Sequence, residues 1–370
     1  MLKNNLLDTI SNIFNNEPKI WNYYNINLNN PLEGKEQAAE FIYKYFKYAC
    51  KINLYIDIDS QGIGRNFSRN IHTAIVFFIG AAIQLKIDPA LYIKSRIRGD
   101  EEQYPFSYIW YLTCLAHDFG YIFEENDYND ELEYMKECVP YLNKYNLVDD
   151  FYKKIILNEP VCLYKKGYKL FGVPYTDGVQ FSNEKLITKP FYSYRTINNY
   201  FRYRLFEMGK LDHGILGGER FYRELVEMYF KDRYSSNGQV KFYYDQIRVW
   251  KYIRNCIQAH NIYKASDSSR NIYIKYGLDE LLSDNYNKIA YENNPVLFIL
   301  CLADTIEPTK KFVNDPPEYI LKNISVNYDN QKNMLNIKLS KKLQDKTGYN
   351  SYINSVKELS DWCDVTINFL

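Results

Sequence analysis

The stretch FSYIWYLTCLAHDFGY, residues 106–121, decides the fold. Its apolar side chains recur at helical spacing and form one stripe: Ile109, Leu112 and Leu115. The stripe runs into the adjacent residues His117 and Asp118, and Gly120 follows as a residue that can end a helix. The pattern predicts a buried helix that stops where two polar side chains emerge.

The chain has four histidines, and the other three lie on similar apolar segments. His72 shares a helical face with four apolar residues in the stretch from 66 to 85: Ile75, Val76, Ile79 and Ile83. His213 falls in the first turn of the helix expected over 210–230, which Asp212 is placed to cap. His260 ends the apolar stripe of residues 243–263.

Asp304 occupies a comparable place in NPVLFILCLADTIEP, residues 294–308, on the face of Leu297, Leu300 and Cys301. A carboxylate on so apolar a face needs a partner, because buried carboxylates are paired, hydrogen-bonded or bound to metal. If all six groups converge, they can hold one or two divalent cations. The set is imidazole and carboxylate only, which suits iron, manganese, nickel, zinc or, less well, magnesium.

Three glycines follow His213 and leave one face of that helix bare: Gly214, Gly217 and Gly218. A bare face allows close approach of either another helix or a ligand. Both alternatives stay open from the residues alone.

The order His72, His117-Asp118, His213, His260, Asp304, each on its own helix, resembles the HD superfamily of metal-dependent phosphohydrolases. The resemblance covers residues 60 to 312, and the adjacent His117-Asp118 pair carries most of its specificity. It implies that a first metal is held by four residues: His72, His117, Asp118 and Asp304. It also implies that Asp118 bridges to a second metal completed by His213 and His260.

The chemistry that this implies is attack on phosphorus by a hydroxide that bridges two cations. Arg69 lies three residues before His72 on the same helical face, and Arg65 lies seven before. Both are candidates to bind phosphate oxygens, and the alternative is that they belong to a solvated first turn of the helix. Tyr121 stands where many family members carry lysine, so it either donates a proton or packs. Asp118, Arg69 and Tyr121 are therefore the candidate catalytic residues.

The favoured function is a phosphodiesterase that acts on nucleotides, cyclic nucleotides or nucleic acid. One alternative is an HD-fold nucleotide sensor or regulatory protein with little turnover, and another is an HD-type nuclease. The GYP signature of cyclic dinucleotide phosphodiesterases is missing. The segment around His213 is similar to the nucleases of CRISPR-associated helicase systems, but those show paired histidines where this chain has His260 alone.

Composition is that of a soluble globular protein, with 46% hydrophobic and 25% charged residues. A net charge of +1 gives no global attraction for nucleic acid or an anionic membrane, so any polyanion site is local. The seven cysteines form no CxxC pair, which indicates reduced thiols in a cytoplasm. The apolar stretch 71–85 is too short to span a bilayer, and we expect no membrane association.

The chain is expected to be mainly α, in three parts. Residues 1–59 form an N-terminal helical region, with a helix near 34–50. Residues 60–312 form the HD phosphohydrolase domain, a helical bundle with a hairpin-rich insertion at about 155–200. Such an insertion is more often a structural excursion with solvated basic side chains than a lid over a substrate phosphate, and four residues are the candidates in the second case: Lys165, Lys166, Lys169 and Arg195. Residues 323–370 form a small ββαβ appendage that either packs on the helical body or mediates self-association, so a homo-oligomer is possible.

Overall fold

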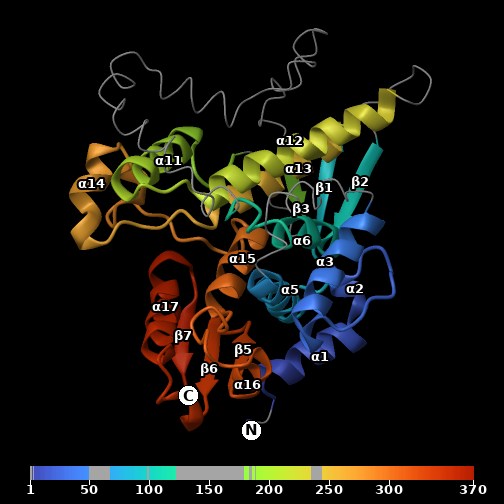
Figure 1. Cartoon of the computed structure of the whole chain (residues 1–370). Helices are drawn as coiled ribbons and strands as arrows, with labels where there is room; N and C mark the ends of the chain where they lie inside the picture. Colours follow the sequence, from blue (N-terminus) through green and yellow to red (C-terminus); the bar gives the residue numbers. More distant parts are fainter. Residues whose placement is uncertain are drawn as a thin grey trace.

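The protein is mainly helical and is built around one long apolar helix (Figure 1). The computed structural model describes residue 2 and residues 4–49, 67–97, 100–121, 179–182, 186–187, 189–234 and 244–370. The central helix is α5 (Phe67–Ile87). Every side chain from Ala74 to Ile79 on this helix is buried. A helix that is apolar on all sides needs neighbours all round it, and α5 accordingly lies in the middle of the molecule.

The N-terminal segment covers one side of α5. It consists of α1 (Leu6–Asn16), α2 (Pro18–Trp21), the 3-10 turn η1 (Pro31–Glu33) and α3 (Lys35–Tyr48), which confirms the helix expected near residues 34–50. The side chain of Asn5 caps α1 by accepting a bond from the amide of Asp8. The ring of Trp21 packs between those of Phe14 and Phe41 and edge-on to Phe78 of α5.

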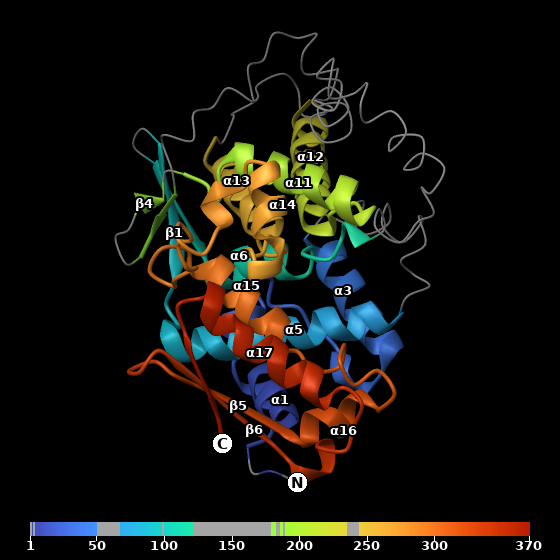
Figure 2. The ribbon, with the colours of Figure 1, turned by 90° about the vertical axis from the view of Figure 1, so that its left-hand side faces the viewer.

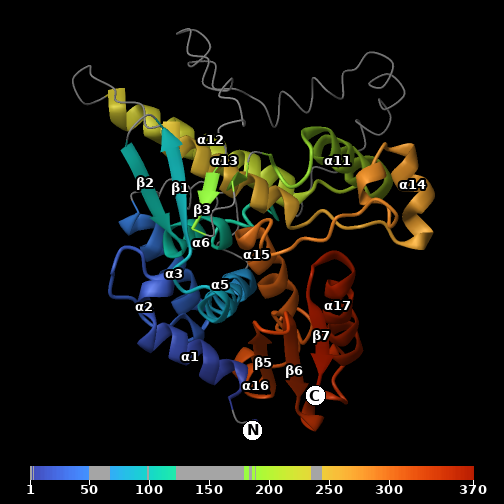
Figure 3. The ribbon, with the colours of Figure 1, turned by 180° about the vertical axis from the view of Figure 1, so that it is seen from behind.

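Four helices complete the core. They are α6 (Phe106–Cys114), α12 (His213–Tyr234), α13 (Tyr244–Ala259) and α15 (Pro295–Ile306). Helices α6, α13 and α15 contact one another, α6 and α15 also contact α5, and α12 lies along α13 (Figure 3). The expected cap of α12 is confirmed, because Oδ1 of Asp212 accepts a bond from the amide of Ile215.

The helix α6 ends earlier than expected. Its last residue is Cys114 and Leu115 caps it, so His117 and Asp118 lie on the turn beyond the helix and Gly120 does not end it. Gly120 is instead needed where this turn meets α12. A Cβ atom on Gly120 would stand 1.8 Å from the carbonyl oxygen of His213, so only glycine allows the two backbones to approach.

A small antiparallel sheet has two strands before residue 150, where helical patterns dominate the sequence, and two within the expected hairpin-rich insertion. Its strands are β1 (Tyr92–Ile97), β2 (Asp100–Pro105), β3 (Val179–Phe181) and β4 (Leu186–Ile187), in the order β2-β1-β3-β4. The β1–β2 hairpin was not expected, because the many charged residues of the sequence 94–102 are typical of a loop. The buried Ile93 of β1 and Tyr104 of β2 pair across it.

The end of the expected insertion is helical, so that part of the prediction is wrong. Strands β3 and β4 do form a hairpin, but α11 (Tyr194–Met208) begins within the segment predicted to be hairpin-rich. The side chain of Ser193 caps α11 by accepting a bond from the amide of Thr196. This cap favours a helix although the surrounding aromatic residues are typical of strands. Arg195 therefore lies exposed in the first turn of a helix. Lys165, Lys166 and Lys169 lie outside the described residues.

Helix α11 lies beside a short helical region. This region contains η4 (Asp267–Ser269), α14 (Arg270–Lys275) and η5 (Asp279–Leu281), as Figure 2 shows. The phenol rings of Tyr203 and Tyr273 join α11 to α14, with ring centroids 5.0 Å apart. These elements flank α12 and α13 on one side.

The C-terminal segment has the predicted ββαβ order. Helix α16 (Pro317–Lys322) precedes β5 (Ile324–Asp329), β6 (Met334–Leu339), the turn η6 (Lys341–Leu343), α17 (Tyr349–Trp362) and β7 (Thr366–Phe369). Strands β5 and β6 are antiparallel, and β6 and β7 are parallel. Helix α17 packs on α15, and β5 contacts α5, so this segment rests on the helical body. The hydroxyl of Tyr352 in α17 donates to the carbonyl of Ile306.

By length and composition, α5 could cross a membrane between Arg69 and Ile87, so the stretch is longer than the sequence estimate allowed. However, 78% of that window is buried inside the protein, as expected for the core helix of a globular fold. Among the described cysteines, four are buried with free thiols: Cys114, Cys256, Cys301 and Cys363.

Candidate metal centre

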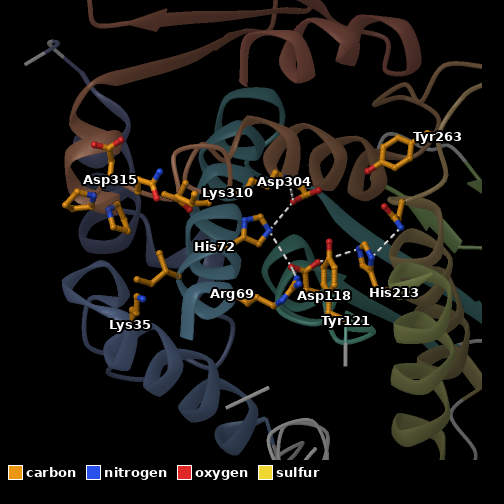
Figure 4. Close-up of a pocket in the computed structure, with 17 residues that line it drawn as sticks. Lys35, Arg69, His72, Asp118, Tyr121, His213, Tyr263, Asp304, Lys310 and Asp315 are labelled. Atoms are coloured by element: carbon orange, nitrogen blue, oxygen red, sulfur yellow. Dashed lines mark hydrogen bonds and ion pairs between the residues drawn. The ribbon is translucent and has the colours of Figure 1, made fainter. Parts of the chain in front are cut away.

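The six predicted ligand residues come together from five separate segments. Figure 4 shows part of this cluster, with His72, Asp118, Asp304 and His213 around one pocket. Nε2 of His72 lies 3.2 Å from Oδ1 of Asp304 and 3.5 Å from Oδ2 of Asp118. Nε2 of His117 lies 3.2 Å from Oδ1 of Asp118. The described residues contain two groups able to hold a metal ion: His72, His117 and Asp304, and His117, Asp118 and His260.

His72 is positioned by α5 and oriented by a residue that the sequence analysis did not single out. Its Nδ1 donates to Oε2 of Glu307 at 2.8 Å, and the Glu307 side chain is fully buried. Burial alone would lower the pKa of His72, but the bonds to Asp304 and Glu307 outweigh it and raise the pKa to about 10. A second partner of this kind fixes the ring orientation of a ligand histidine.

Glu307 is itself held by three bonds from the loop after α15. The amide and hydroxyl of Thr309 donate to its Oε1, and the amide of Lys310 donates to its Oε2. Burial would raise the pKa of Glu307, but the bonds from His72 and Thr309 lower it. The only sequence signal for this role was an acidic residue just beyond Asp304, one turn along the end of α15.

His117 presents one nitrogen to the cluster and bonds through the other. Its Nδ1 lies 2.6 Å from the carbonyl oxygen of Cys114, which can only accept, so Nδ1 carries the hydrogen and Nε2 carries the lone pair. Burial lowers the pKa of His117, so the ring is neutral. Nε2 is buried without a hydrogen-bond partner.

Asp118 faces different histidines with its two oxygens. Oδ2 is near His72, while Oδ1 is 3.2 Å from Nε2 of His117 and 3.9 Å from Nε2 of His213. Burial would raise the pKa of Asp118, but its interactions with the neighbouring histidines lower it to about 2. The carboxylate is therefore ionised and offers an oxygen to each side.

His260 follows the last residue of α13. Its Nδ1 bonds to the carbonyl of Ile257, so Nε2 again carries the lone pair, and burial with the neighbouring His117 and His213 lowers its pKa to about 3. The ring centroids of His260 and His213 are 5.4 Å apart.

His213 lies at the edge of the cluster. It belongs to neither compact ligand group, and it approaches Asp118 at 3.9 Å. The glycines beside it permit close helix packing as well as access to the site. A Cβ atom on Gly214 would touch the ring of His260 at 3.2 Å, and one on Gly217 would stand 2.7 Å from the amide nitrogen of Gly120.

Arg69, Tyr121 and His213 form a stack at the rim of the cluster. The guanidinium carbon of Arg69 lies 3.3 Å from the ring centroid of Tyr121, and the other side of that ring faces His213 at 3.8 Å. Burial and the charge of Asp118 raise the pKa of Tyr121, so its hydroxyl remains protonated. Arg65 lies outside the described residues.

The cluster opens into a pocket of about 630 Å³. The candidate catalytic residues Asp118, Arg69 and Tyr121 all line it, whereas Arg204, another basic residue before α12, lies 3.4 Å from Asp212 and lines no part of it. Further lining residues come from the loop after α15 and from the end of α13: Thr309, Lys310, Asn261 and Tyr263. A pocket of this size can take a nucleotide-sized ligand.

The donors fit a divalent metal ion. All four histidines are buried, and Nε2 of His117 and of His260 can accept because Nδ1 of each bonds to a backbone carbonyl. Nε2 of His117 has no hydrogen-bond partner. The carboxylates of Asp118 and Asp304 are ionised, because the pKa of each is lowered. These buried groups could bind a metal ion. No family model matches this chain, and no curated protein or solved structure matches it at a significant level.

Proposed function

We propose that this chain is a metal-dependent phosphohydrolase of the HD type, acting as a phosphodiesterase on nucleotides, cyclic nucleotides or nucleic acid. The observation that carries the proposal is the meeting of four histidines and two ionised aspartates in one cluster, of which His72, His213, Asp118 and Asp304 line a pocket together with Arg69. Six such groups from distant segments have no structural need to meet in a helical core.

The order of these residues along the chain resembles that of the HD superfamily, and this resemblance supports assigning the candidate ligands to two metals. His72, His117 and Asp304 would hold one metal, and His213 and His260 would hold a second, with Asp118 shared. This sharing is supported by the contacts of Asp118, because its Oδ2 faces His72 and its Oδ1 faces both His117 and His213. Divalent cations in such a set supply positive charge to phosphate oxygens and lower the pKa of water.

The chain's own residues supply the rest. Arg69 is fixed over the pocket by its stack on Tyr121 and presents a fork that suits phosphate oxygens. Tyr121 keeps its hydrogen and donates it toward an oxygen of the substrate or leaving group. Asp118 orients the attacking water by accepting a hydrogen bond from it.

Metal analysis of the purified protein and a substrate panel test the proposal together. We expect about one to two equivalents of a transition metal per chain, and hydrolysis of bis-p-nitrophenyl phosphate, cyclic nucleotides, nucleoside triphosphates or single-stranded DNA. The variant D118N should lose turnover, whereas D267N, at an exposed aspartate of η4, should not. Metal binding without turnover of any substrate would support the regulatory alternative instead, and a chain that binds no metal would overturn both.

A further inference from the structure

Three lysine or arginine side chains and three aspartates line the pocket. The basic lining residues are Lys35, Arg69 and Lys310, and the acidic ones are Asp118, Asp304 and Asp315. Asp315 pairs with Lys346, which lies outside the pocket lining. Once Asp118 and Asp304 bind divalent cations, the lining keeps a surplus of positive charge that a substrate must neutralise.

Lys310 is the basic residue with the most direct tie to the ligand set. Its Nζ lies 2.9 Å from Oδ1 of Asp304, and its backbone amide donates to Oε2 of Glu307 at 3.3 Å. The same bonds that hold Glu307 against His72 thus fix the position of the Lys310 backbone. The side chain is 37% exposed, so its end can move within the pocket while the backbone stays in place.

The oxygen that Lys310 contacts is also the one that faces the histidines. Oδ1 of Asp304 lies 3.2 Å from Nε2 of His72 and 3.9 Å from Nε2 of His117. An ammonium group at this oxygen repels a divalent cation on the same oxygen. Metal binding and the Lys310–Asp304 pair therefore oppose each other, and a bound metal favours movement of Lys310 toward any anion in the pocket.

A second lysine lies on the same side of the pocket. Figure 4 shows Lys35 and Lys310 on one side of His72, with Tyr263 on the opposite side. Lys35 is the first residue of α3, so it comes from the N-terminal helices, whereas Lys310 comes from the loop after α15. Two cations from different elements thus line the same pocket as the ligand cluster.

We infer that Lys310, together with Lys35, binds a second phosphate group, so that the substrate carries at least two phosphates and the reacting one lies at the ligand cluster. This inference rests on the proposed function. It makes Lys310 a substrate-binding residue that also weakens metal binding at Asp304. Removal of the charge of Lys310 should therefore strengthen metal binding and weaken substrate binding.

The test replaces Lys310 by Met, which keeps the length of the side chain and removes its charge. In K310M, metal binding measured by competition with a chelating dye should tighten by about threefold or more, since a repelling charge is lost. For a nucleoside triphosphate, kcat/KM should fall by about 10- to 100-fold, the range of a bond to a charged group. For bis-p-nitrophenyl phosphate, which has one phosphate, the change should stay below about threefold.

Two further variants serve as controls. K310R keeps the charge and should retain the preference for the triphosphate, and K332M, at an exposed lysine of the β5–β6 turn, should match the wild type. A protein that binds no metal and cleaves neither substrate refutes the proposed function. A protein that binds metal and cleaves the diester, but whose K310M variant shows equal losses on both substrates or weaker metal binding, refutes the role of Lys310 alone.

Discussion

Nδ1 of His72 donates to Oε2 of Glu307 at 2.8 Å, although the two residues are 235 positions apart in the chain. The bond joins the central helix α5 to the end of α15 and sets the direction of the His72 ring. Because Glu307 is fully buried and accepts three further bonds from Thr309 and Lys310, it cannot turn away without breaking this network.

Removal of the Glu307 charge should therefore weaken metal binding. In E307Q the amide oxygen can still accept from His72, but the negative charge that raises the basicity of the ring is gone. We expect the dissociation constant for the first metal to rise by about 10- to 100-fold, as for other outer partners of ligand histidines. The measurement is a competition titration with a chelating dye. The matched control is E318Q, at an exposed glutamate of α16, and an equal effect in both variants would contradict the positioning role.

Metal binding should release a proton from His72. Burial would lower the pKa of this ring, but Asp304 and Glu307 raise it to about 10, so before metal binds it is protonated at neutral pH. A metal needs the neutral ring, hence binding should tighten as pH rises from about 6 toward 9 and should expel about one proton. Calorimetry at pH 7.5 in two buffers of different ionisation enthalpy measures this release. Equal heats in the two buffers would show that His72 is not a protonated ligand.

Two variants of Tyr121 separate its hydroxyl from its ring. Y121F keeps the stack between Arg69 and His213 and should lower kcat by about tenfold, with KM nearly unchanged, because only the donated hydrogen bond is lost. Y121A also frees Arg69, so KM should rise as well. Steady-state kinetics on bis-p-nitrophenyl phosphate give both values. If Y121F behaves as the wild type, Tyr121 only packs.

A methyl group on Gly120 should disturb both the fold and the site. In G120A the new Cβ would lie 1.8 Å from the carbonyl oxygen of His213, so the turn that carries His117 and Asp118 must move away from α12. We expect a loss of about 1–3 kcal/mol in the free energy of unfolding, together with weaker metal binding. Urea unfolding measures the first quantity. G34A is the control, since its Cβ would meet only the flexible end of Gln37 in extended backbone.

The candidate ligand residues could be predicted from the sequence because each one lies on an apolar helical stripe or directly after one. The stripes around His72, His260 and Asp304 pointed inward, and the structure brings these side chains together. Helical spacing of apolar residues also predicted α3, α15 and α17, and alternation of apolar and polar residues predicted the C-terminal strands β5, β6 and β7.

What the sequence could not show depends on tertiary contact. The β1–β2 hairpin is charged at its turn, and the pairing of Ile93 with Tyr104 becomes apparent only when the strands meet. The role of Glu307 depends on a residue far away in the chain, which no local pattern reports. The end of α6 at Cys114 is set by the docking of the next turn on α12 rather than by Gly120 acting as a helix stop.

The bond between His72 and Glu307 also has a consequence for biosynthesis. The ribosome makes His72 long before it makes Glu307. Asp304, which belongs to the same candidate metal group as His72, is also made late. A nascent chain that has reached His260, just after α13, contains all four histidines but neither Asp304 nor Glu307. Binding of a cation by the group of His72, His117 and Asp304 would therefore have to wait until α15 leaves the ribosome and docks, whereas the group of His117, Asp118 and His260 is complete earlier in synthesis.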